Sequence, residues 1–207
     1  MGKVFGIWYD AEPSSETILD AWHVKSELTN AFICEDLLRI RRYESLSAGP
    51  RYFCLYEYAS ALNRFPTQSS WAPALQNSTN SSRINAVCCL SGRPLLNLNP
   101  TIGGTATTIR IRLKNDESLK SIQALLEQQI FLLPGITSVM LWLDEAGISS
   151  NANNGIDAQE AAILIEGVRP GSVAAAWTQC AAAQALKLDR KTVNSTAYRL
   201  LQITSRP

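Results

Sequence analysis

The chain has 207 residues, of which 46% are hydrophobic and 18% are charged; this excludes a disordered chain and predicts a packed core. Nineteen Lys and Arg against eighteen Asp and Glu give a net charge of +1, without the basic excess of nucleic-acid binders. The longest basic cluster, Arg39, Arg41 and Arg42, divides between the two faces of a strand. We therefore expect no nucleic-acid partner.

Membrane and secretion signals are also missing from the sequence. No apolar run reaches the roughly 20 residues that a membrane-spanning helix needs, so we expect no membrane partner. Residues 1–10 have the pattern of a strand, not of a secretory leader. The cysteines are odd in number and show no CxxC spacing, which favours reduced thiols: Cys34, Cys54, Cys88, Cys89 and Cys180. Together these features predict a cytoplasmic protein.

The first part of the chain mixes strand and helix patterns. It begins with a strand pattern over residues 4–9, followed by a helical pattern over 14–33 whose N-terminus Ser14 or Ser15 can cap. The strand patterns of this part cover residues 4–9, 39–43, 51–58 and 84–90. The helical patterns cover residues 14–33 and, more weakly, 60–75. Residues 93–107 are rich in Pro, Gly, Asn and Thr, which is the composition of a linker.

The second part repeats this order. Its strand patterns cover residues 108–113, 137–143, 161–168 and 195–203, and its helical patterns cover 118–130 and 172–188. Residues 1–92 and 108–207 therefore each have the βαββαβ order of a ferredoxin-like unit. Such a unit leaves one face of its antiparallel sheet bare. We predict an α+β fold in which two tandem ferredoxin-like halves form an intramolecular α+β barrel.

Four short segments carry a resemblance to a known family. They are residues 18–28 (ILDAWHVKSEL), 38–43 (LRIRRY), 50–58 (PRYFCLYEY) and 132–136 (LLPGI). This pattern resembles the dimeric α+β barrel superfamily, and within it the EthD-like branch. The resemblance implies a pocket between the helices and the sheet. It also implies activities that range over polyketide-tailoring cyclases, dehydratases, decarboxylases, isomerases and cofactor-free monooxygenases, while other members bind haem.

The chain departs from this family at one position. Trp22 matches the family's tryptophan, but the family's histidine position falls on Glu27, and His23 falls on the aromatic residue that follows the tryptophan. His23 and Glu27 are spaced i and i+4, one helical turn apart. On a helical wheel both lie opposite the apolar face, which favours a pair on the surface, whereas the family resemblance favours a pair in the pocket. Both alternatives remain open.

The candidate catalytic residues are His23, Glu27, Tyr43 and Tyr56. His23 is the single histidine and its ordinary pKa suits proton transfer near neutral pH, while Glu27 could orient it or act as the base. The two tyrosines could donate to a developing enolate oxygen. The candidate substrate-binding residues are Trp8, Trp22, Arg42 and Phe53. Arg42 could hold a carboxylate or phenolate, whereas aromatic residues on strands are more often core.

These residues predict a cofactor-independent enzyme that acts by proton abstraction on a small aromatic or polyketide-like substrate, as cyclases, dehydratases and isomerases do. The alternatives are a cofactor-free monooxygenase and a non-catalytic binding or assembly module with a degenerate site. One histidine and scattered carboxylates predict no metal site, and haem on His23 would lack a further partner beyond Glu27. We expect no cofactor and a small apolar or aromatic ligand; a homodimer remains open.

Overall fold

The computed structural model describes residues 2–11, 36–59, 84–113, 116–145, 159–180 and 194–205. The strands are β1 (Val4–Ala11), β2 (Leu37–Ser45), β3 (Tyr52–Tyr58), β4 (Ile84–Gly92), β5 (Pro94–Leu98), β6 (Thr105–Leu113), β7 (Ile136–Leu143), β8 (Gln159–Gly167) and β9 (Asn194–Ser205). The helices are α4 (Asp116–Leu125), the π-helical turn η4 (Leu126–Ile130) and α6 (Pro170–Gln179). Every predicted strand is confirmed; the helices predicted over 14–33 and 60–75 lie outside the described residues.

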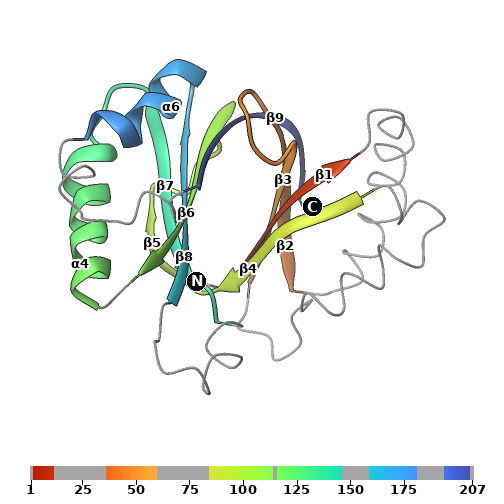
Figure 1. Cartoon of the computed structure of the whole chain (residues 1–207), viewed down its shortest axis with the longest axis horizontal. Helices are drawn as coiled ribbons and strands as arrows, with labels where there is room; N and C mark the ends of the chain where they lie inside the picture. The colour runs from red at the N-terminus through yellow and green to blue at the C-terminus, as the bar shows by residue number, and fades with distance from the viewer. Residues whose placement is uncertain are drawn as a thin grey trace.

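The described strands form one antiparallel sheet in the order β4-β1-β3-β2-β9-β6-β8-β7-β5. Strand β9 joins the two halves, because its first part pairs with β6 and its later part pairs with β2. In Figure 1 it arches between the two groups of strands. Within each group the strands follow the same order, since β4-β1-β3-β2 corresponds to β9-β6-β8-β7. This confirms the α+β class, and the origin of the two groups as tandem repeats remains a prediction.

The stretch 93–107, expected to be a linker, contains strand β5 and the start of β6. Strand β4 pairs with β1 of the first half, and β5 pairs with β7 of the second half. Arg93 alone separates β4 from β5, so this segment connects the halves at a second place, in addition to β9. The linker interpretation was wrong here. Proline is tolerated in this strand because Pro94 is its first residue, a position that needs no ladder N–H. The division into domains remains a prediction.

Helices α4 and α6 cover the outer face of the second half of the sheet (Figure 1). The core between them is almost wholly aliphatic, with Ile109, Ile111, Val139, Leu141, Ile163 and Ile165 on the strands and Ile122, Leu126 and Val173 on the helices. The helix predicted over 118–130 changes to π-helical spacing at Leu126, where Leu126 and Ile130 are both buried. Neither described α-helix is long and apolar enough to cross a membrane.

A second core fills the space enclosed by the sheet, which we call the barrel interior. It combines residues of both halves, among them Trp8, Phe53 and Leu55 from the first half and Met140, Trp142 and Leu164 from the second. Trp8 stacks on Trp142 with ring centroids 6.3 Å apart. The inner sheet faces of the two groups of strands therefore pack against one another.

Gly6 lies where this packing is tightest. A Cβ atom at Gly6 would lie 3.0 Å from Trp142 Cζ2, 3.1 Å from Trp8 Cη2 and 3.3 Å from Phe53 Cε2. All three rings are fully buried and have little room to move. We expect Gly6→Ala to lower the free energy of unfolding by about 1–3 kcal/mol, measured by urea unfolding. Gly104→Ala is the control, because no atom lies within 4 Å of its added Cβ; equal stability of the two variants would contradict the prediction.

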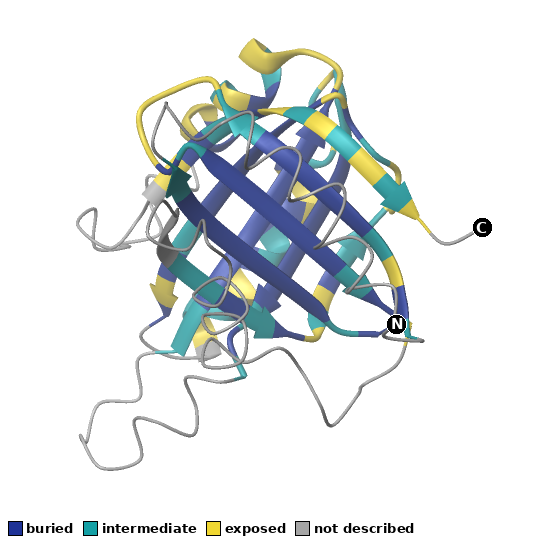
Figure 2. Ribbon diagram, turned by 90° about the vertical axis from the view of Figure 1, so that its right-hand side faces the viewer, coloured by how far each residue is buried: buried dark blue, intermediate teal, exposed yellow. Residues whose placement is uncertain are grey.

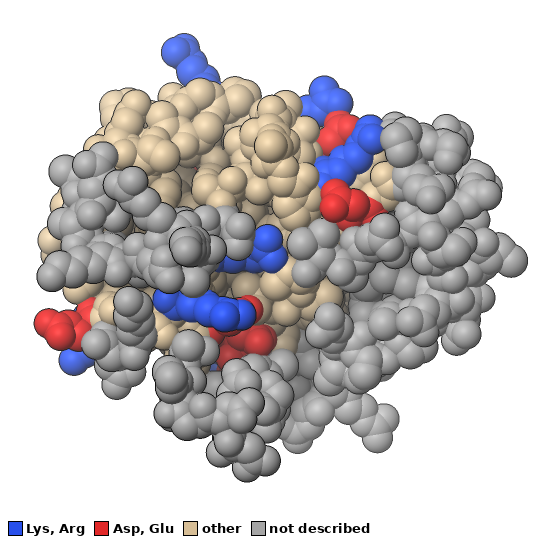
Figure 3. All heavy atoms as spheres, in the orientation of Figure 1, with Lys and Arg blue, Asp and Glu red and all other residues tan. Residues whose placement is uncertain are grey.

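Basic and acidic side chains are intermingled on the face shown in Figure 3, where blue and red groups adjoin one another between uncharged areas. Surface ion pairs among the described residues include Arg199 with Glu44 and Arg112 with Glu160. The described part of this face therefore presents no continuous basic patch.

Candidate functional site

The strands of the first half have two faces with different chemistry. Along β3, Phe53 and Leu55 belong to the core of the barrel interior, whereas Tyr52, Cys54 and Tyr56 belong to a separate core on the opposite side. We call that opposite side the outer face of the first half. Figure 2 looks onto it and shows its strands buried along most of their length.

The structure divides the predicted site residues between these two faces. Trp8, Phe53 and Tyr43 are paired neighbours across β1, β3 and β2 and point into the barrel interior. Arg42 is paired with Cys54, and Tyr56 belongs to the same outer-face core. Successive residues of a strand point to opposite faces, so Arg42 and Tyr43 cannot line one pocket, and neither can Tyr43 and Tyr56. Trp22, His23 and Glu27 lie outside the described residues.

Trp8 and Phe53 have the surroundings of core residues. Their rings stack 4.8 Å apart, and Trp8 Nε1 donates a hydrogen bond of 2.9 Å to Thr108 Oγ1 on β6. Phe53 also lies 5.6 Å from the Tyr43 ring. Both side chains are almost completely buried in the seam between the halves. A substrate-binding role for them would need a ligand inside this packed interior.

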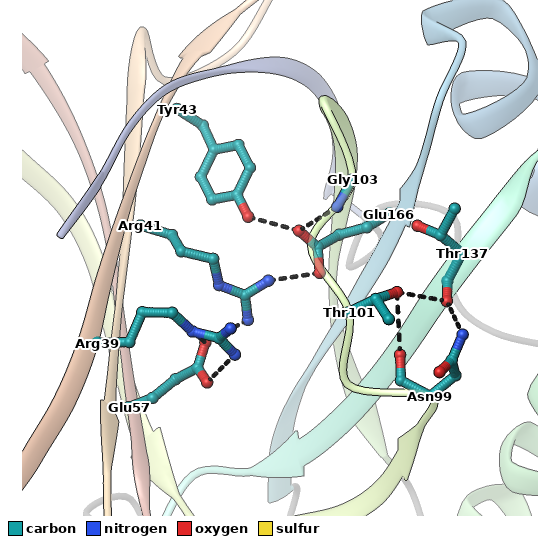
Figure 4. Close-up of polar contacts among 9 residues, drawn as sticks. All are labelled: Arg39, Arg41, Tyr43, Glu57, Asn99, Thr101, Gly103, Thr137 and Glu166. Atoms are coloured by element: carbon teal, nitrogen blue, oxygen red, sulfur yellow. Dashed lines mark hydrogen bonds and ion pairs between the residues drawn. The ribbon is translucent and has the colours of Figure 1, made fainter. Parts of the chain in front are cut away.

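A buried polar network crosses the barrel interior (Figure 4). Glu166 on β8 accepts hydrogen bonds from Tyr43 Oη at 2.7 Å and from the Gly103 N–H at 3.4 Å, and its other carboxylate oxygen pairs with the Arg41 guanidinium. Arg41 and Tyr43 come from β2, so the network joins the two halves. The side chains of Arg41 and Glu166 are each 1% exposed. A carboxylate and a guanidinium at such depth must be paired to be tolerated.

The network continues toward the surface through Glu57 and Arg39. Arg41 also pairs with Glu57, which holds Arg39 through contacts of 2.5 Å and 3.2 Å. Burial by itself lowers the pKa of Arg41, but Tyr43, Glu166 and Glu57 outweigh it and raise the pKa above its usual range. Burial raises the pKa of Tyr43 well above its usual range, although the charge of Arg41 acts in the opposite direction. Tyr43 is therefore a neutral donor to Glu166.

The outer face carries a second polar group, formed by Tyr9, Arg42, Tyr52 and Cys54, which we call the Tyr9 cluster. Arg42 Nε donates to Tyr9 Oη at 3.3 Å, and the Arg42 guanidinium lies 4.7 Å from the centre of the Tyr52 ring. The Tyr9 and Tyr52 rings stack 5.3 Å apart, and Tyr9 Oη lies 3.7 Å from Cys54 Sγ. All four residues are buried.

The corresponding face of the second half shows that folding does not require such a cluster. There the strand residues of the core against α4 and α6 are aliphatic, and the buried Thr107 is a polar residue of the same strand parity as Ile109 and Ile111. Burying a phenol or a guanidinium costs free energy unless each polar group is paired, whereas an aliphatic residue has no such cost. The polar set on the first half is therefore the stronger indication of a functional site.

Several residues of the buried network and the Tyr9 cluster were not among the sequence candidates, and Tyr9, Glu166 and Arg41 are the most informative of them. The alternation of β1 places Tyr9 on the same sheet face as Phe5 and Ile7. The register with β3 is needed to show that its hydroxyl lies beside Arg42. Glu166 is the one charged residue between Ala161 and Gly167 in β8, and a lone carboxylate in an apolar strand is a signal that could have found it. Arg41 belongs to the basic cluster that the sequence divides between two strand faces, and the structure buries it fully.

The cysteines and the acidic groups give no sign of metal or thiol chemistry within the described ranges. The described cysteines are free thiols, with Cys88 and Cys89 next to one another on β4. Burial raises the pKa of Cys88, and raises the pKa of Cys89 to about 12, so both are poor nucleophiles. Among the residues that the structure describes, no group of three or more His, Cys, Asp or Glu is placed to hold a metal ion.

Comparison with known proteins gives structural relatives only. No family model matches the sequence, and no curated protein matches it. A provisionally named monooxygenase from Lactobacillus acidophilus is 8% identical, with 99% of this chain and 97% of that chain aligned at a TM-score of 0.59. An anthrone oxidase-like protein is 12% identical, with 98% and 92% aligned at 0.60. A single-residue mutant of chlorite dismutase from Candidatus Nitrospira defluvii is 11% identical, with 97% and 91% aligned at 0.58.

These likenesses extend over nearly the whole of each chain, so they apply to the complete two-half architecture and not to one half of it. Together with the strand order they show the fold, an α+β barrel shared with these solved structures. Membership of the dimeric α+β barrel superfamily remains a prediction. At 8–12% identity they show the fold and do not establish the activity. The EthD-like branch remains a prediction.

Proposed function

We propose that the protein is a cofactor-independent oxygenase that acts on a small polycyclic phenol or ketone at the outer face of the first half. The observation that carries this proposal is the Tyr9 cluster, whose phenols, thiol and guanidinium lie on a face whose counterpart in the second half has an aliphatic core. Its aromatic side chains would suit a flat aromatic ligand, and Arg42 would supply a cation to an oxygen atom. The anthrone oxidase-like neighbour has this overall fold and supports the choice of substrate class.

The chemistry begins with removal of a proton from a carbon next to a carbonyl group. For an anthrone, loss of a methylene proton gives an enolate, which transfers electrons to dioxygen. One oxygen atom becomes the new carbonyl oxygen of an anthraquinone, and the other leaves as water with the two methylene hydrogens. The substrate itself supplies the electrons, so the reaction needs no further reductant. His23 and Glu27 remain the proposed bases.

The test is dioxygen uptake with anthrone in the presence of a chelator, together with the appearance of anthraquinone absorption. We expect wild-type protein to accelerate both, and Arg42→Met to weaken anthrone binding about 10- to 100-fold, the value of one charge-assisted hydrogen bond. Leu141→Met is the matched control, because Leu141 lies in the aliphatic core on the outer face of the second half. Thermal melting of both variants checks that they are folded.

The outcomes separate the alternatives. Proton abstraction also begins cyclisation, dehydration and isomerisation, so hydrogen exchange at the methylene group without dioxygen uptake would favour those reactions. Binding of anthrone without exchange or uptake would favour the non-catalytic module. Failure to bind anthrone, or equal loss of binding in the Arg42 and Leu141 variants, would overturn the proposed site.

A further inference from the structure

We propose that the Tyr9 hydroxyl is the hydrogen-bond donor to the substrate oxygen that gains negative charge, and that the Arg42 guanidinium sets its direction. This inference rests on the proposed function, which it deepens by restricting the substrates to flat aromatic molecules with a carbonyl or phenol oxygen. Tyr9 is not among the residues that the family resemblance indicates.

The donor direction follows from the contact between the two side chains. A guanidinium can only donate, so Tyr9 Oη is the acceptor in its 3.3 Å contact with Arg42 Nε. The phenolic O–H is therefore directed away from Arg42, where Cys54 Sγ, 3.7 Å from Tyr9 Oη, is a weak acceptor that a substrate oxygen would replace. A positive neighbour also strengthens a phenol as a donor, since it stabilises the charge that the oxygen acquires as its proton is drawn toward an acceptor.

The position of the hydroxyl also suits this role. Tyr9 belongs to β1 and Arg42 to β2, with β3 lying between them, so the contact spans three strands. The contact of Tyr9 Oη with Cys54 Sγ places the hydroxyl over the central strand of the three. Tyr52 stacks on Tyr9 and also lies against the Arg42 guanidinium, which restricts the movement of both groups. A donor held in this way needs little reorganisation when charge develops on a substrate.

The substrate class follows from the same geometry. A stacked pair of phenol rings favours a flat aromatic skeleton, and a polarised O–H favours an oxygen that becomes an enolate or phenolate. Hydrocarbons of the same shape lack the acceptor and would offer the polar groups of the cluster no new contact, which costs affinity.

Two measurements on the full chain test the inference with Tyr9→Phe, which keeps the ring and removes only the hydroxyl. With anthrone, we expect kcat for dioxygen uptake to fall about 100- to 1,000-fold with little change in KM, the usual effect of losing one oxyanion donor. With bound 2-hydroxyanthraquinone, we expect the absorption change of ionisation to move about one pH unit higher than in wild type. Tyr198→Phe is the control, since it removes a phenol that donates to the Pro50 carbonyl in the barrel interior.

The outcomes distinguish this inference from the proposed function. Tyr9→Phe with unchanged kcat and unchanged ligand ionisation would overturn the inference even if the wild type oxidises anthrone. A wild type without dioxygen uptake that nevertheless shifts the ionisation of 2-hydroxyanthraquinone through Tyr9 would overturn the oxygenase and leave the donor role standing. Equal effects of Tyr9→Phe and Tyr198→Phe would show a general structural effect and would also overturn the inference.

Discussion

Glu166→Gln is expected to lower the free energy of unfolding by about 3–5 kcal/mol, the usual cost of breaking a buried ion pair on one side. The variant keeps the shape of the side chain and removes only its charge. Arg41 would then keep Glu57 as a counter-ion but would lose its fully buried one, while remaining itself 1% exposed. Arg41 Nε already has no hydrogen-bond partner among the described residues, so the guanidinium has few other acceptors to replace Glu166.

Urea unfolding of Glu166→Gln and of Glu160→Gln gives a matched comparison. Glu160 lies on the same strand and pairs with Arg112 at 2.9 Å, but the two side chains are 38% and 62% exposed. An exposed pair of this kind contributes about 0–1 kcal/mol. We therefore expect a large loss for Glu166→Gln and almost none for Glu160→Gln. Similar losses in the two variants would show that burial of the network does not govern its contribution.

The double variant Glu166→Leu with Arg41→Met tests the cause of this loss. If the loss arises from leaving one charge buried and unpaired, removing both charges should recover most of it, because apolar replacement of a buried pair is often neutral or stabilising. The two single variants would then show strong coupling in a double-mutant cycle. Losses that simply add would mean that the network acts through shape and not through charge.

Most of the fold could be predicted because each strand contains its own signal. Ile109, Ile111 and Leu113 alternate with arginines in β6, and the aromatic residues of β3 mark it as a strand. Strand β5 could not be predicted in the same way. Its short sequence begins with proline, and its place at the second connection between the halves depends on pairing with β7, which is far away in the chain.

The site was less predictable because it depends on which face each strand residue takes. Arg42 and Tyr43 are adjacent and both suit catalysis, yet the sheet sends them to opposite sides. The alternation of the sequence shows which residues of β3 share a face of the sheet. It does not show which residues of β2 share that face, because this depends on the register between the two strands, in which Arg42 pairs with Cys54. The link between Tyr43 and Glu166 spans 123 residues, which no local pattern reveals.

The stability of the protein is expected to fall steeply above about pH 10, because two interior tyrosines resist ionisation when the protein is folded. Burial raises the pKa of Tyr43 and of Tyr198 above the ordinary value of 10.0. In the unfolded chain both lose their protons near that ordinary value, so the unfolded state then binds fewer protons than the native state. Stability from this source is complete below pH 10 and is lost as the pH rises, by about 1.4 kcal/mol per pH unit for each tyrosine.

By pH 11.5 the two residues together would remove about 4 kcal/mol, which urea unfolding between pH 9 and 11.5 can measure. Tyr43→Phe should reduce this slope by about half, although it also loses the hydrogen bond to Glu166 and so starts from a lower stability. Cys88 and Cys89 are present in both proteins, so any effect of their thiols cancels from the difference. A slope that is the same in Tyr43→Phe and in wild type would mean that Tyr43 ionises in the folded protein, and the interior network would then be open to solvent at that residue.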